Sequence, residues 1–109
     1  MLNAYSIFDE KAKCFNTPFF AVADGVAIRD FGDLCNDSRS LVSRHPEDYR
    51  VYCIGRFNDD NGKLESLNVP EFLANGSDLI RLVQPLNGED KAIEPVQPGG
   101  ESGDINAQN

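Results

Sequence analysis

The stretch DGVAIRDFGDL at residues 24–34, followed directly by a cysteine, contains the clearest helix signal in this sequence. Apolar side chains recur there at spacings of three and four residues, which places them on one stripe of an α-helix. The members of this stripe are Ala27, Ile28, Phe31, Leu34 and Cys35. Asp24 carries a side chain typical of an N-cap, so we expect an amphipathic helix from Asp24 to about Asn36.

The stretch YRVYCIGRF at residues 49–57 has the alternating pattern of a β-strand. Tyr52 and Ile54 share one face with two arginines, whereas Val51, Cys53 and Phe57 occupy the other. Because both faces carry apolar side chains, we expect a central strand or a strand that is covered at a contact between subunits. The pattern therefore favours a homo-oligomer.

The remaining segments predict a small sheet around these two elements. Further strands are expected at residues 2–8, 63–67 and 79–83, and a turn is expected at the sequence NDDNG, residues 58–62. Residues 9–18 and 37–48 are expected to be loops, and residues 19–22 form an apolar run before the helix. His45-Pro46 should keep the helix from resuming before the next strand, and Pro70 should open a short helical turn over residues 71–74. The predicted fold is α+β, a small antiparallel or mixed sheet with one main amphipathic helix.

The last part of the chain differs in composition from the rest. Residues 85–109 contain three prolines, no aromatic residue and five acidic residues against one lysine. Such a segment buries too little apolar surface to offset its ordering entropy. We therefore expect an α+β domain over residues 1–84 and a disordered acidic tail over residues 85–109.

Composition also excludes several function classes. The formal net charge is −8, which argues against a dedicated binder of duplex DNA. The three cysteines form no Cys-x-x-Cys pair and there is one histidine, so a zinc finger is excluded. The first residues lack the basic and apolar regions of a signal peptide, and no apolar run is long enough to span a bilayer, so we expect neither a signal peptide nor a membrane span. We find no catalytic motif, and we expect no enzyme activity, no metal and no cofactor.

One group of positive and aromatic side chains has the composition of a binding site. It consists of Arg39, Arg44, His45, Tyr49, Arg50 and Arg56. Arginine and aromatic side chains on a sheet can bind single-stranded nucleic acid, because phosphates meet guanidinium groups and bases stack on rings. The alternative is a solvated surface on which the arginines pair with Glu47, Asp48, Asp59 and Asp60.

Several motifs resemble those of a known viral family. The runs VAIRDFGDL (26–34) and SRHPEDY (43–49) and the pattern Tyr52-x-Ile54-Gly55-x-Phe57 are similar to the small nonstructural protein of gokushoviruses. The opening YSIFD (5–9) and the pattern Asp59-x-x-Gly62-x-Leu64-Glu65 also fit. Gokushoviruses are microviruses, which are bacteriophages with single-stranded DNA genomes. The resemblance covers residues 4–75.

The resemblance implies a function that the residues alone do not. It suggests a non-enzymatic protein that assists viral single-stranded DNA synthesis and genome packaging in the host cytoplasm. Its expected partners are viral replication or procapsid proteins, and its mode of action remains open between two hypotheses. The protein either contacts single-stranded DNA weakly through the arginine-rich group, or it acts as a protein-interaction adaptor that never touches DNA.

Overall fold

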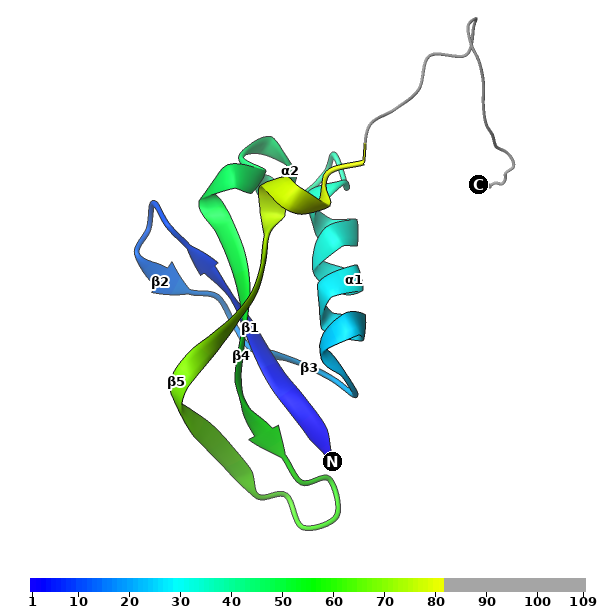
Figure 1. Cartoon of the computed structure of the whole chain (residues 1–109), viewed down its shortest axis with the longest axis vertical. Helices are drawn as coiled ribbons and strands as arrows, with labels where there is room; N and C mark the ends of the chain where they lie inside the picture. Colours follow the sequence, from blue (N-terminus) through cyan, green and yellow to red (C-terminus); the bar gives the residue numbers. More distant parts are fainter. Residues whose placement is uncertain (82–109) are drawn as a thin grey trace, which may run out of the picture.

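The computed structural model describes residues 1–81, which form an antiparallel sheet with one main helix on one of its faces (Figure 1). In chain order the elements are β1 (Leu2–Asp9), β2 (Cys14–Phe15), β3 (Phe19–Ala21), α1 (Asp24–Cys35), α2 (Leu41–Arg44), the 3₁₀ helix η1 (Pro46–Asp48), β4 (Tyr49–Phe57), β5 (Leu64–Asn75) and the 3₁₀ helix η2 (Gly76–Leu79). The predicted α+β class, with a small antiparallel sheet and one main helix, is confirmed. The predicted tail, residues 85–109, lies outside the described residues.

The sheet is built around β1 and β4, which pair along almost their whole length. β5 continues the sheet beyond β4, and β2 and β3 both pair with the other edge of β1. The predicted central position of residues 49–57 is therefore confirmed. Ile54 has no partner on β1, because the register shifts between Tyr5 opposite Cys53 and Ala4 opposite Gly55. This β-bulge strengthens the local twist of the sheet and reverses the alternation of β4 after Cys53. The predicted faces of Arg56 and Phe57 are therefore wrong, because Arg56 lies on the side of Cys53 and Phe57 lies on the side of Tyr52.

The apolar stripe of α1 packs against one face of the sheet. Ala27, Phe31 and Cys35 are at most 1% exposed. They contact a sheet layer of Tyr5, Ile7, Val51 and Cys53, so burial of the stripe accounts for the position of the helix. The predicted cap differs in detail, because Ala23 occupies the N-cap position and Asp24 is the first helical residue. The Asp24 carboxylate instead accepts a hydrogen bond of 2.8 Å from the hydroxyl group of Tyr5.

Two loops that the sequence predicts contain short elements. Residues 9–18 include β2, whose Phe15 pairs with Phe8. Residues 37–48 include α2 and η1, so the prediction that no helix resumes before β4 is wrong. Ser40 explains α2, because its hydroxyl group accepts a hydrogen bond from the Ser43 N–H at 3.1 Å and caps the helix. The turn at residues 58–62 is confirmed, with Gly62 at a φ of 78°.

The segment after this turn differs most from prediction. The helical turn expected at residues 71–74 is wrong, because β5 runs from Leu64 to Asn75 and pairs Glu71 with Cys53 and Phe72 with Tyr52. The expected last strand at residues 79–83 is also wrong over its described part, since η2 ends at Leu79. Residues 82–83 lie outside the described residues. Asn36 fixes the segment at residues 79–81, because its side-chain amide donates to the Leu79 carbonyl and accepts from the Arg81 N–H.

Candidate functional site

The face of the sheet opposite α1 is the candidate site, and we call it the open face. No helix of residues 1–81 packs on this face, and α1 lies on the other side of the sheet (Figure 1). Alternation along the strands decides which side chains it presents, since Tyr5 and Ile7 point to the helix and Phe8 points away. The large apolar side chains of the open face are Phe8, Phe15, Phe20, Tyr52, Phe57, Leu64 and Phe72. An uncovered sheet face usually carries polar side chains, so this composition indicates a binding surface.

Four aromatic rings form a row across the open face. The ring centroids of Phe8 and Phe15 are 4.9 Å apart, those of Phe15 and Tyr52 are 5.5 Å apart, and those of Tyr52 and Phe72 are 5.8 Å apart. The last two pairs are edge-to-face, with interplanar angles of 74° and 71°. Phe15 and Phe72 remain 44% and 50% exposed. The row is therefore a packed group with ring surface available to a ligand.

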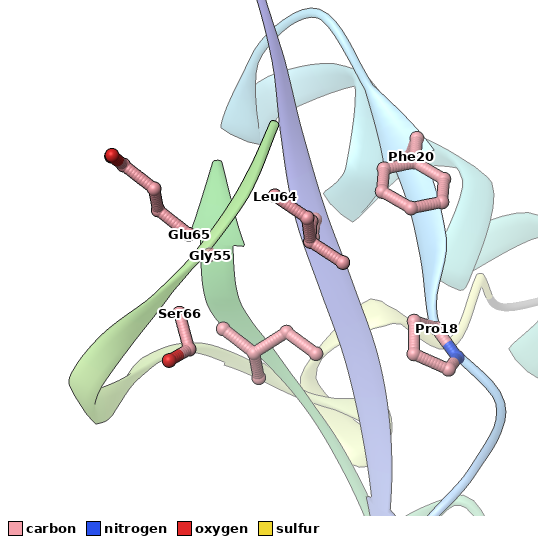
Figure 2. A pocket seen from close by; sticks show the side chains of 8 residues that line it. Pro18, Phe20, Gly55, Leu64, Glu65 and Ser66 are labelled. Carbon is pink, nitrogen blue, oxygen red and sulfur yellow. The ribbon is translucent and has the colours of Figure 1, made fainter. Parts of the chain in front are cut away.

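An apolar pocket lies beside this row, towards the turn between β4 and β5. Its volume is about 240 Å³, and Figure 2 shows Pro18 and Phe20 on one side of it and residues of β5 on the other. The lining residues are Ala4, Pro18, Phe20, Ile54, Gly55, Leu64, Glu65 and Ser66. Gly55 is required here, because a Cβ atom at this position would lie 2.5 Å from the Glu65 carbonyl oxygen. The missing side chain lets β5 approach closely and leaves the pocket open.

Arg50 is the basic residue of the predicted group that lies on the open face. It pairs with Phe8 across the strands, at the edge of the aromatic row. Its Nη1 atom is 2.6 Å from the Glu10 carboxylate, and its Nε atom donates to the Asn75 side chain at 3.1 Å. The hydrogen bond from Arg50 lowers the pKa of Glu10, and the same contact raises the pKa of Arg50. The positive charge of Arg50 is therefore already balanced within the protein.

The structure does not bring the other predicted residues onto this face. Arg39 lies beyond the end of α1 and forms an ion pair with Asp37 at 3.0 Å. Arg44 and His45 are exposed at the end of α2, and the His45 ring lies 3.9 Å from the Glu47 carboxylate. Two more of the six lie on the helix side of the sheet, since Tyr49 packs against the core there and Arg56 contacts the Cys53 sulfur at 3.2 Å. The six residues therefore occupy several surfaces.

Two other groups with chemical potential are visible among the described residues. Ligand atoms of His45, Glu47 and Asp48 lie within 4.8 Å of one another on the surface. Cys35 and Cys53 are 1% exposed, and burial raises the pKa of the Cys35 thiol to about 11, which keeps it protonated. Neither group lies on the open face.

Sequence reasoning missed most of the aromatic row. Phe72 was not assigned to the sheet because a helical turn was expected at residues 71–74, and Phe15 was not assigned to it because a loop was expected at residues 9–18. Phe8 could have been found, because the alternation of the strand at residues 2–8 places it on the opposite face from Tyr5 and Ile7. Among residues 1–81, no helix has the length and apolar character needed to cross a membrane.

Comparisons with known proteins agree on one family. The model of the family described as "Phage ORF5 protein" matches residues 2–79. Among curated proteins, Protein ORF5 of Chlamydia phage 1 is 36% identical over 63 residues, which cover 54% of this chain and 66% of that protein. No solved structure matches the chain.

Proposed function

This chain belongs to the phage ORF5 protein family, the small nonstructural proteins of gokushoviruses, and we propose that it assists viral single-stranded DNA synthesis and genome packaging by contacting single-stranded DNA with its open face. The action is non-enzymatic and takes place in the host cytoplasm. Its partners there are viral replication or procapsid proteins.

The observation that carries this proposal is the exposed aromatic row. Bases of single-stranded DNA stack on aromatic side chains with about 1–3 kcal/mol per base. Phe15 and Phe72 expose ring surface, and Tyr52 lies between them. Duplex DNA keeps its bases stacked inside the helix, so this surface favours single strands.

The charge of the protein limits the strength of this contact. The net charge is −8, and the Arg50 guanidinium group is engaged by Glu10. Few phosphates can therefore be neutralised, and the bulk field opposes the approach of DNA. With about one to four phosphate contacts at roughly 0.7 per contact, the salt slope should be about −1 to −3.

The test is fluorescence anisotropy with a labelled single strand and the corresponding duplex, measured over a salt series. We expect weak binding that prefers the single strand and has this shallow salt slope. Phe72→Ala should weaken binding by about 5- to 150-fold, the equivalent of one lost stacking contact. Leu41→Ala is the matched control, because Leu41 is an apolar side chain of α2 that is 68% exposed and lies off the open face. Equal affinity of both variants and the parent would exclude stacking on this face.

A second candidate function is a protein-interaction adaptor that binds the replication complex or the procapsid without touching DNA. The neutralised Arg50 and the apolar pocket favour it, because both suit a protein surface better than a phosphate backbone. If the parent protein does not bind single-stranded DNA even at low salt, the adaptor takes the place of the DNA-binding proposal.

A further inference from the structure

We propose that a second copy of this chain covers the open face, in a two-fold arrangement that sets Lys11 of each copy against the partner's Asp60. This proposal goes beyond the function above and stands without it. It rests on the apolar content of the face, on the charges at its two ends and on the pocket beside the β4–β5 turn.

The apolar side chains of the open face favour burial against another protein surface. Phe15, Phe20, Leu64 and Phe72 are between 44% and 62% exposed, and all four lie on the open face. The domain is small, so burial of these side chains would add substantially to its core. A second copy brings an identical apolar face of the same size.

The β5 edge of the sheet is a poorer place for association than the open face. β5 pairs only with β4, which leaves its other edge without a neighbour among residues 1–81. Residues 67–70 of β5 also have no partners on β4, and Pro70 has no N–H to donate. Glu65 and Glu71 add negative charge along the same strand. Such interruptions are typical of edges that avoid pairing with another chain.

The β1–β2 turn and the β4–β5 turn each carry one charged side chain that has no ion-pair partner among the described residues. At the β1–β2 turn, Glu10 pairs with Lys13 and Arg50, which leaves Lys11 without an ion-pair partner among residues 1–81. At the β4–β5 turn, Asp59 pairs with the N-terminus and Lys63 pairs with Glu65. These contacts leave Asp60 without a cationic partner among the residues that the structure describes. The two turns lie at opposite ends of the sheet (Figure 1).

These charges select one orientation of the partner. A two-fold axis that lies parallel to the sheet and across the strands places the β1–β2 turn of each copy over the partner's β4–β5 turn. Lys11 then faces the partner's Asp60, and the contact occurs twice in the dimer. An axis along the strands would set Lys11 against the partner's Lys11, which is repulsive.

The same orientation gives the pocket an occupant. Phe15 lies next to the β1–β2 turn, and the pocket lies towards the β4–β5 turn. The two-fold operation therefore brings the exposed ring of Phe15 over the pocket that Phe20 and Leu64 line in the partner. The pocket volume of about 240 Å³ is below the roughly 300 Å³ at which pockets for drug-sized ligands begin, and it suits a single aromatic side chain. Buried aromatic anchors of this kind usually dominate the energy of an interface.

Charge reversal tests this arrangement. Sedimentation equilibrium of the full chain at micromolar concentration should give twice the mass of one 12.0 kDa chain. Lys11→Glu should raise the dimer dissociation constant by about tenfold, because two attractive contacts become repulsive. Lys11→Glu combined with Asp60→Lys should restore the parent value. Arg29→Glu, the same charge change on an exposed position of α1, should leave the dimer intact.

Three results would overturn the proposal. The first is a monomer at all concentrations of the parent protein. The second is an equal effect of Lys11→Glu and Arg29→Glu, which would assign the change to net charge. The third is a double variant no more associated than Lys11→Glu alone, which would exclude the Lys11–Asp60 contact. DNA binding is measured separately, so failure of the dimer and failure of the proposed function can be told apart.

Discussion

Tyr5 shows how a single side chain joins the sheet to the helix. Its ring is fully buried, and its hydroxyl group donates to the Asp24 carboxylate at 2.8 Å and accepts from the Asn3 side chain at 3.0 Å. The sequence placed Tyr5 correctly in a strand and Asp24 at the start of the helix. It could not reveal the contact between these two residues, which are 19 positions apart, because the contact depends on how the strand and the helix pack together.

Replacement of Tyr5 by phenylalanine should destabilise the protein by about 1–2 kcal/mol, because the Asp24 carboxylate loses a hydrogen bond from a buried donor. The effect should depend on pH. Burial raises the pKa of Tyr5 from 10.0 to about 12, so its stabilising contribution is complete below pH 10 and is lost as the pH rises through 12. Urea unfolding from pH 7 to pH 12 should therefore show a difference between parent and variant that shrinks above pH 10. A constant difference over this range would contradict the assigned role.

Elements that depend on local periodicity were predicted well, and those that depend on pairing were not. α1 and β4 follow from their own apolar patterns. The end of β5 does not, because Pro70 and the residues after it have the signature of a helix start, and pairing with β4 overrides this local preference. β2 has two residues and exists only as a partner of β1. The composition of the open face could therefore not be predicted from the sequence, since three of its aromatic side chains lie on β2, β3 and the end of β5.

The packing of η2 against its neighbours offers a test at the level of elements. A Cβ atom on Gly76 would lie 2.5 Å from the Pro46 carbonyl oxygen and 3.3 Å from the Cys35 sulfur. Gly76→Ala should therefore push η2 away from η1 and α1 and destabilise the protein by about 1–3 kcal/mol. Gly25→Ala is the control, because nothing lies within 4 Å of its Cβ position in α1, and it should leave stability unchanged or raise it by up to about 1 kcal/mol. Equal thermal midpoints for the two variants would argue against this packing.

At the scale of the whole molecule, the two faces of the sheet have separate roles. One face holds α1 and the core, and the other presents an aromatic row and a pocket. The proposed dimer and the proposed DNA contact use the same open face, so they should compete. The apparent affinity of the parent for single-stranded DNA should fall as the protein concentration rises, because the dimer covers the open face. Lys11→Glu weakens the dimer, so its apparent affinity should depend less on protein concentration. Arg29→Glu carries the same charge change and is the control, and it should keep the dependence of the parent.

The central claim is that the open face is the binding surface for single-stranded DNA. The most direct measurement is a titration of the ¹³C-labelled protein with a short single strand, followed through the NMR signals of the phenylalanine and tyrosine rings. The NMR signals of the Phe15, Tyr52 and Phe72 rings should shift, because these rings lie on the open face. The rings of Phe19, Phe31 and Tyr49 lie on the helix side and serve as internal controls, so their NMR signals should not shift. Shifts confined to these control rings, or no shift at low salt, would contradict the claim.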